Sequence, residues 1–152
     1  MLTAIIVPTL EEVENIVPLV EQIEQTRVQF SEIIFVDDGS TDGTREKVRE
    51  LPPAHRVRLI ERNGAERGLA GAIIAGANSS SADFFVVMDA DLSHPPEEIP
   101  ALLQPILANE ADLVVGSRYI PGGATPGWPA WRRLLSRVAS GVAYPLTGVH
   151  DA

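Results

Sequence analysis

The 152-residue sequence contains no cysteine and a single lysine, Lys47, and it has no apolar run that approaches the roughly 20 residues of a membrane-spanning helix. Without cysteine the chain can form neither a disulfide framework nor a thiolate metal site, which is typical of proteins in a reducing compartment. The formal net charge is -9, whereas nucleic-acid binders need a basic surface to displace counterions. We therefore expect a chain without a secretory leader or a membrane span, and with no nucleic-acid partner.

Three common catalytic motifs are also missing. The first apolar run leads into Pro-Thr-Leu-Glu-Glu and not into G-x-G-x-x-G, which excludes the usual dinucleotide-binding loop. The sequence has no G-x-x-x-x-G-K-[ST], which excludes a P-loop NTPase. It has neither a G-x-S-x-G elbow nor a cysteine nucleophile, so the familiar covalent hydrolases are excluded as well.

What the chain does contain is an alternation of short apolar runs and segments of helical periodicity. The runs that predict strands cover residues 2–7, 33–36, 57–60, 84–88 and 113–115. The segments that predict helices cover residues 13–23, a short stretch through Lys47 to residue 51, residues 69–77 and residues 99–107. We expect Pro8 to end the first strand and Pro105 to kink the last helix.

The order of these segments predicts the fold class. Strands that are apolar on both faces and separated by helices indicate an α/β fold, with a mostly parallel sheet and helices on both faces. The length suits one domain over residues 1–152. In open sheets of this kind, ligands bind beyond the carboxyl ends of the strands.

Acidic side chains follow three of the expected strands. They are Glu11 and Glu12 after the first, Asp37 and Asp38 after the second, and Asp89 and Asp91 after the fourth, while the fifth leads into Arg118. Because parallel strands end at one edge of a sheet, we expect these side chains to gather there. Clustered carboxylates are costly unless they bind a cation or accept hydrogen bonds from ligand hydroxyls. The planar guanidinium of Arg118 matches phosphate oxygens.

Each of these features also has a simpler interpretation. Residues 37–44 are rich in the types that turns and helix caps prefer. Asp91 equally suits a cap for the helix that begins near Pro95, and His94 suits a polar loop. A receiver-type signalling domain also clusters acids, but it places a lysine after the fifth strand, where this chain has Arg118. The coincidence of acids at several strand ends is what favours a binding site.

Five stretches, in order along the chain, resemble family 2 glycosyltransferases of the GT-A (Rossmann-like) fold. They are residues 5–16 (IIVPTLEEVENI), 35–44 (FVDDGSTDGT), 67–72 (RGLAGA), 88–100 (MDADLSHPPEEIP) and 115–119 (VGSRY). Within the family the sequence is most similar to polyprenyl-phosphate (dolichyl-phosphate) mannose synthases. The resemblance implies inverting transfer of mannose from GDP-mannose to a polyprenyl phosphate, with Mg²⁺ or Mn²⁺ as cofactor. Two alternatives stay open: a UDP-sugar enzyme such as a polyprenyl-phosphate glucose synthase, and a non-catalytic nucleotide-sugar-binding fragment.

The resemblance also implies roles for single residues. Those that would bind the donor nucleotide are Pro8, Glu12, Val36, Asp38 and Ala90. Asp89 and Asp91 would hold the metal as the D-x-D element. Arg118 and Arg132 would contact the acceptor phosphate, so Asp91, Arg118 and Arg132 are the implied catalytic residues.

The sequence departs from the family pattern at its start and at its end. Leu10 and Glu11 stand where the family has the tyrosine and asparagine of P-T-Y-N-E. Relatives continue beyond Ala152, so we expect residues 1–152 to be the front portion of a single catalytic domain. Residues 128–146 combine tryptophan, arginine and apolar residues, which suits either a helix packed on the domain or one lying in a membrane surface. The lipid substrate favours the second, and with it a peripheral location at the cytoplasmic face of a membrane.

Overall fold

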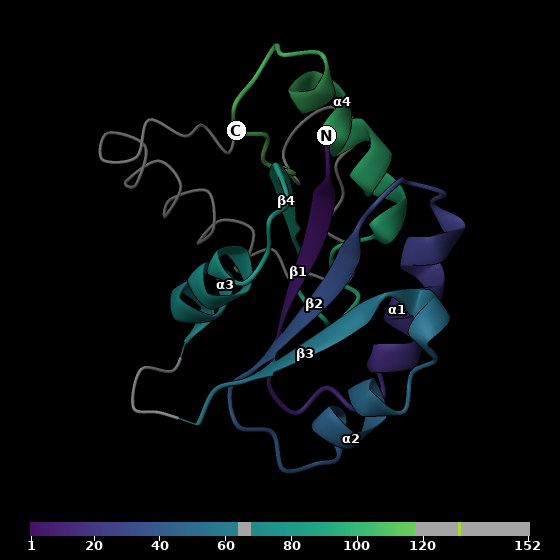
Figure 1. Ribbon diagram of the computed structural model, residues 1–152, viewed down its shortest axis with the longest axis vertical. Helices are drawn as coiled ribbons and strands as arrows, with labels where there is room; N and C mark the ends of the chain where they lie inside the picture. The colour runs from purple at the N-terminus through teal and green to yellow at the C-terminus, as the bar shows by residue number, and fades with distance from the viewer. Residues whose placement is uncertain (64–67, 118–130, 132–152) are drawn as a thin grey trace. The chain divides into compact units, whose positions relative to one another are not determined.

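The computed structural model describes residues 1–63, 68–117 and 131, in two units, Met1–Gln104 and Pro105–Ala152. The secondary structure of the described residues alternates strands and helices (Figure 1). Its elements are β1 (Thr3–Thr9), α1 (Ile16–Gln25), β2 (Glu32–Asp37), α2 (Thr44–Arg49), η1 (Pro53–His55), β3 (Val57–Glu61), α3 (Leu69–Asn78), β4 (Phe84–Val87), η2 (Pro96–Glu98) and α4 (Ile99–Leu107). None of the helices in these described ranges has both the length and the apolar character needed to cross a membrane.

The strands form one parallel sheet in the order β3-β2-β1-β4. β1 lies in its interior, with Ile6 paired to Ile34 of β2 on one side and to Val87 of β4 on the other. Neighbouring parallel strands are expected to be joined by right-handed crossover connections that contain a helix. The connection from β1 to β2 contains α1, and the connection from β2 to β3 contains α2. The predicted α/β fold with a parallel sheet is therefore confirmed.

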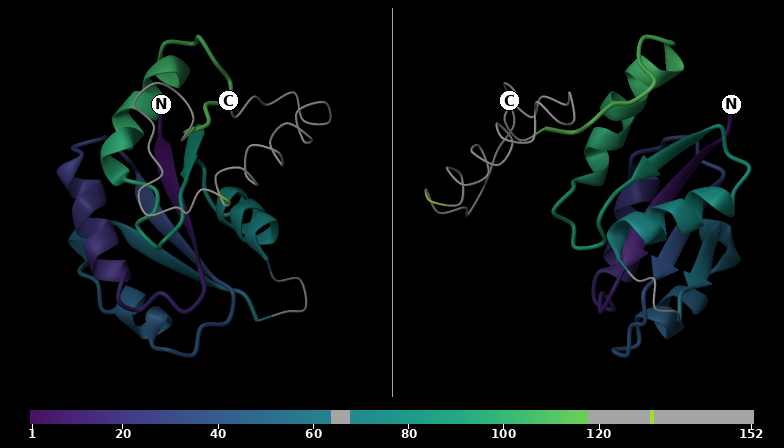
Figure 2. Two further views of the ribbon diagram at one scale, coloured as in Figure 1. Left: turned by 180° about the vertical axis from the view of Figure 1, so that it is seen from behind. Right: turned by 90° about the vertical axis from the view of Figure 1, so that its left-hand side faces the viewer.

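The apolar residues of β1 and β2 alternate between two cores. Ile5 and Phe35 belong to the core shared with α1 and α2, whereas Ile6 and Val36 belong to the core beneath α3. Figures 1 and 2 show α3 on one side of the sheet and α1 on the other. The prediction that helices cover both faces is confirmed, and its cause is the absence of polar residues from the middle of β1 and β2.

Helix α3 comes unusually close to the sheet at Gly76. A Cβ added at this glycine would lie 2.8 Å from Cγ2 of Ile6 and 3.2 Å from Cγ2 of Val36. Gly76, which weakens the intrinsic helix propensity of α3, is thus explained by close packing.

The prediction that Pro8 ends the first strand is wrong, because β1 continues to Thr9. The carbonyl of Ile6 accepts a hydrogen bond from the amide of Met88, after β4, and the carbonyl of Thr9 accepts one from Asp38, after β2. Since alternate residues of a parallel strand face opposite neighbours, Pro8 faces the β4 side, where the pairing with β1 stops at Ile6. The missing N–H of Pro8 therefore costs no ladder hydrogen bond.

The prediction of a fifth strand at residues 113–115 is also wrong. These residues form no strand, and the side chains of Leu113 and Val115 are 72% and 55% exposed. An apolar run becomes a strand only where a neighbouring edge satisfies its backbone groups.

Candidate functional site at the carboxyl edge of the sheet

Three neighbouring strands end at the edge where the acidic residues were expected. The order β2-β1-β4 places the segments that follow these strands next to one another. The backbone N–H of Asp38 donates to the carbonyl of Thr9 at 3.1 Å, which joins the ends of β2 and β1. The predicted gathering of Glu12, Asp38 and the Asp89–Asp91 pair at one edge therefore agrees with the topology.

The segment after β1 is held by side chains of the segment after β2. We call residues 10–15 the first loop and residues 38–43 the second loop. Three consecutive backbone N–H groups of the first loop donate to side-chain oxygens: Glu11 to Ser40 Oγ at 2.9 Å, Glu12 to Thr44 Oγ1 at 2.8 Å, and Val13 to Asp42 Oδ2 at 3.1 Å. These donors are consumed within the protein, so the first loop presents acceptors to a ligand and not the amide cradle that binds phosphate.

The helix α1 begins at Ile16 and not at residue 13, where the periodicity predicts its start. Val13 has the right spacing for the helix, but its amide bonds to Asp42 across the loops. The helix begins only after the first loop has turned, and Asn15 then accepts the amide of Leu19 through its backbone carbonyl.

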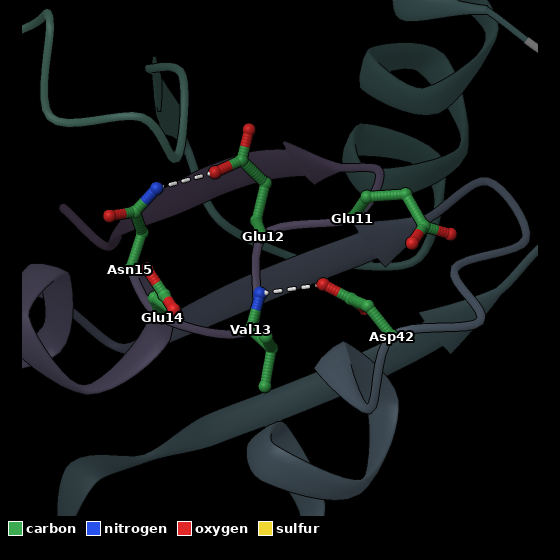
Figure 3. A pocket seen from close by; sticks show the side chains of 6 residues that line it. All are labelled: Glu11, Glu12, Val13, Glu14, Asn15 and Asp42. Atoms are coloured by element: carbon green, nitrogen blue, oxygen red, sulfur yellow. Dashed lines mark hydrogen bonds between the residues drawn. The ribbon is translucent and has the colours of Figure 1, made fainter.

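Glu12 lies beside an open hollow of about 370 Å³ (Figure 3). The residues that line it are Glu11, Glu12, Val13, Glu14, Asn15 and Asp42. The Glu12 carboxylate accepts a hydrogen bond from the side-chain amide of Asn15 at 2.6 Å, through Oε2. A wall of carboxylates suits ligand hydroxyl and amine groups and is unfavourable for a bare anion.

Asp37 and Asp38 are adjacent in sequence but lie in different environments. Asp37 is fully buried, and it accepts the backbone N–H groups of Gly39 and Ser40 at 3.0 Å each. It also accepts the Ser40 hydroxyl and forms an ion pair with Arg45. Burial by itself would raise the pKa of Asp37, but the hydrogen bonds from Ser40, Arg45 and the Gly39 backbone outweigh it and hold the pKa below its ordinary value.

Asp38 is bonded through both carboxylate oxygens. Oδ1 pairs with Nη1 of Arg62 at 2.8 Å, and Oδ2 accepts the backbone N–H of Gly68 at 2.6 Å. The sequence did not predict the structural role of Asp37, and it did not indicate Arg62 as a residue of this edge. No motif marks Arg62, whereas the turn-rich composition after residue 37 was a signal for the role of Asp37.

Buried and more exposed residues alternate along β4, and this alternation continues beyond the strand through the D-x-D segment. Met88 and Ala90 are 4% and 2% exposed, whereas Asp89 is half-buried and Asp91 is exposed. The single intervening residue thus anchors the segment and leaves the two acids at the surface. The amide of Asp89 donates to Nδ1 of His94 at 3.2 Å, so His94 is bound to the motif.

Asp91 also has a local structural role. Its Oδ1 accepts the backbone N–H of Ser93 at 2.9 Å, which stabilises the turn around Leu92, a residue with φ of 59°. The described residues contain no group of three or more His, Cys, Asp or Glu side chains that could hold a metal ion. Two carboxylates of this kind fit a divalent cation whose remaining ligands come from a bound diphosphate and water.

The remaining residues that the resemblance implied fall into two groups. Val36 is fully buried in the core beneath α3, and Pro8 is partly buried within β1. Arg118 and Arg132 lie outside the described residues, as does most of the segment 128–146. The assignments of all four residues stay predictions.

A comparison with protein families identifies the chain. The model of glycosyl transferase family 2 matches residues 4–145. This chain belongs to that family. The receiver-type alternative is thereby excluded.

Curated relatives of this family member share long stretches with it. The chain is 44% identical over 140 residues to the dolichol-phosphate mannosyltransferase of Pyrococcus furiosus, a match that covers 91% of this chain and 39% of that protein. It is 42% identical to the polyprenol monophosphomannose synthase of Mycolicibacterium smegmatis, with 98% and 58% covered. The chain thus spans about half the length of the curated relatives it matches, or less.

Solved structures of glycosyltransferases confirm the GT-A fold. A glucosyl-3-phosphoglycerate synthase from Mycobacterium tuberculosis, in complex with Mn²⁺, UDP-glucose and phosphoglyceric acid, superposes with a TM-score of 0.71 at 25% identity, covering 97% of this chain and 50% of that one. A mannosyltransferase from Pyrobaculum calidifontis, in complex with GDP-mannose and Mn²⁺, superposes with a TM-score of 0.57 at 30% identity, covering 65% and 30%.

Proposed function

We propose that this chain is part of a metal-dependent inverting glycosyltransferase that moves mannose from GDP-mannose to a polyprenyl phosphate. The observation that supports the proposal is the strand order β2-β1-β4, because the segments that carry Asp38, Glu12 and the D-x-D pair follow parallel strands that end at one edge of the sheet. The names of the relatives at 44% and 42% identity support mannose as the sugar and a polyprenyl phosphate as the acceptor.

In this proposal the first and second loops bind the nucleoside part of the donor. The carboxylates of Glu12 and Asp38 accept hydrogen bonds from hydroxyl or N–H groups of the nucleoside, because both loops present acceptors. Pro8, Val36 and Ala90 contribute backbone groups and packing, since the side chains of Val36 and Ala90 are buried.

Asp89 and Asp91 would hold Mg²⁺ or Mn²⁺ beside the donor diphosphate. A cation bound there supplies positive charge where negative charge grows as the nucleotide leaves. The protein's own contribution is to fix two carboxylates at the surface through the buried Met88 and Ala90, so that they need no reorganisation on binding.

Arg118 and Arg132 would bind the acceptor phosphate and reduce its repulsion from the donor. The phosphate oxygen attacks the anomeric carbon from the face opposite the leaving nucleotide, which inverts the configuration. A phosphate monoester is already ionised near neutral pH, so we assign no general base. A lipid acceptor supports a location at a membrane surface, and we propose the cytoplasmic face, with residues 1–152 belonging to one catalytic domain.

Calorimetric titration of the chain with GDP, UDP and GDP-mannose, with and without Mn²⁺, tests the proposal. We expect GDP and GDP-mannose to bind, and to bind more tightly with Mn²⁺. A preference for UDP would instead assign a UDP-sugar donor, as in the complex of the Mycobacterium tuberculosis enzyme. Absence of nucleotide binding, or binding that ignores the metal, would overturn the donor site.

A further inference from the structure

We infer that Glu11 is a positioning residue, whose side chain fastens the second loop to the first and thereby fixes Glu12 for the donor. The inference rests on the proposed function, because Glu12 matters for binding only if the edge of the sheet receives a nucleotide. Glu11 itself is bonded to the protein and is not assigned a contact with the ligand.

The backbone of Glu11 is in a conformation that glutamate rarely adopts. Its φ is 59°, in the left-handed region that glycine and asparagine tolerate best. Asparagine or glycine would suit this conformation, whereas glutamate strains it. A strained residue persists only where surrounding interactions hold it.

The side chain of Glu11 supplies such interactions. Its Oε1 accepts the backbone N–H of Thr41 at 2.7 Å and the Thr41 hydroxyl at 3.1 Å. Both donors approach the same oxygen, and one of the two bonds fixes the main chain of the second loop. Asparagine is one methylene shorter, so the reach to Thr41 is a property of the longer side chain.

The backbone of Glu11 is bound to the second loop as well. Its N–H donates to Ser40 Oγ at 2.9 Å, and the Ser40 hydroxyl in turn donates to the buried Asp37. Glu11 is thus connected at both ends, and through Ser40 to a carboxylate that is itself paired with Arg45.

The position of Glu11 in the chain gives these bonds a consequence for binding. β1 ends at Thr9, and Glu11 is the residue at which the chain turns before Glu12. Fixing φ of Glu11 therefore fixes the direction in which the Glu12 carboxylate leaves the first loop. Losing the connection to Thr41 would let the first loop sample other conformations, so that a ligand must order it on binding.

Two substitutions separate the effect of the hydrogen bonds between Glu11 and Thr41, which we call the bridge, from the effect of the backbone strain at Glu11. E11Q keeps the length of the side chain and a carbonyl oxygen that can accept both bonds from Thr41. E11G relieves the left-handed strain but removes the bridge. A residue with only a structural role would give E11G a changed melting temperature and an unchanged affinity.

We expect E11Q to bind GDP with Mn²⁺ within about twofold of the unsubstituted chain, because an amide oxygen replaces the carboxylate oxygen as acceptor. We expect E11G to bind roughly tenfold more weakly, the equivalent of one charge-assisted hydrogen bond, although its melting temperature is equal or higher. Titration calorimetry gives the affinities. Equal affinity of E11G and the unsubstituted chain overturns the inference, and so does E11Q binding as weakly as E11G, which would mean that the charge acts on the ligand directly.

Hydrogen exchange provides a measurement that needs no nucleotide. The amides of Glu12 and Val13 should exchange faster in E11G than in E11Q, because their acceptors lie on Thr44, which directly follows the second loop, and on Asp42 within it. Unchanged exchange in E11G overturns the positioning role. If the unsubstituted chain binds no nucleotide, the proposed function fails, while the exchange rates still decide whether Glu11 fastens the two loops.

Discussion

The buried hydroxyl of Thr44 accepts the backbone N–H of Glu12 at 2.8 Å, which joins the first residue of α2 to the middle of the first loop. The same hydroxyl donates to Oδ1 of Asp42 at 2.6 Å. Thr44 is fully buried, whereas Glu12 is partly buried and Asp42 is exposed. One side-chain oxygen thus connects both loops of the proposed donor site.

Thr44→Val should therefore destabilise the fold although it keeps the shape of the side chain. It removes two hydrogen bonds, the one that the Glu12 N–H donates and the one that Asp42 accepts from the hydroxyl, at a cost of about 1 kcal/mol each in the free energy of unfolding. Urea denaturation measures this cost. Thr44→Ser is the matched control, because it retains the hydroxyl and loses only a methyl group, worth about 0.8 kcal/mol. A valine variant as stable as the serine variant would contradict the prediction.

Asp37→Asn should lower stability and change how stability depends on pH. The substitution removes a buried negative charge that pairs with Arg45, and breaking such a pair costs about 3 kcal/mol. Because the pKa of Asp37 in the folded chain lies below its ordinary value, its ionised form stabilises the fold above about pH 4. That contribution is lost as the pH falls from about 4 through the lower pKa of the folded state.

The measurement is the free energy of unfolding in urea from pH 2 to pH 6. The unsubstituted chain should lose stability steeply on acidification, and the Asp37→Asn variant should lose less over the same range. Glu97→Gln, which changes an exposed acid of η2, is the control and should leave the slope unaltered. Parallel curves for the Asp37→Asn variant and the unsubstituted chain would show that Asp37 is not the group responsible.

The edge of the sheet was predictable from the sequence because its causes are local. The runs that became β1, β2 and β4 are apolar on both faces, and such strands form parallel sheets whose ends coincide. The segments that carry the acids therefore follow strands that end at one edge. The D-x-D spacing has an equally local cause, since the alternation of a strand buries Ala90 between two exposed acids.

The connections between the loops were not predictable in the same way. Ser40, Asp42 and Thr44 are typical of a turn and cap, and Asp42 does bond to the amide of Thr44. Their further bonds to the first loop depend on how two strands 28 residues apart are placed side by side, which periodicity does not encode. The fifth strand failed for a related reason, because an apolar run does not reveal whether a partner edge exists.

Gly76→Ala tests the close approach of α3 to the sheet. The added Cβ would lie 2.8 Å from Ile6 and 3.2 Å from Val36, both in a fully buried core. We expect a net loss of about 1 to 2 kcal/mol in the free energy of unfolding, since overpacking outweighs the gain in helix propensity. In the comparison variant Gly71→Ala, the Cβ would meet only the guanidinium of Arg62, the far end of a flexible side chain, which would shift within its ion pair with Asp38. Thermal or urea denaturation should then show Gly71→Ala to be the more stable of the two, and the opposite order would refute the packing argument.

Asp91→Asn tests whether the D-x-D pair binds a cation. The asparagine oxygen can still accept the backbone N–H of Ser93, so the turn is retained while one negative charge is lost. With only one carboxylate left beside the diphosphate, the increase in GDP affinity caused by Mn²⁺ should shrink at least about tenfold, because hard cations depend on the number of charged oxygen ligands. Calorimetry with and without Mn²⁺ measures this, and Glu97→Gln should keep the full metal effect. If the metal effect survives in Asp91→Asn while its melting temperature is unchanged, Asp91 serves the turn alone.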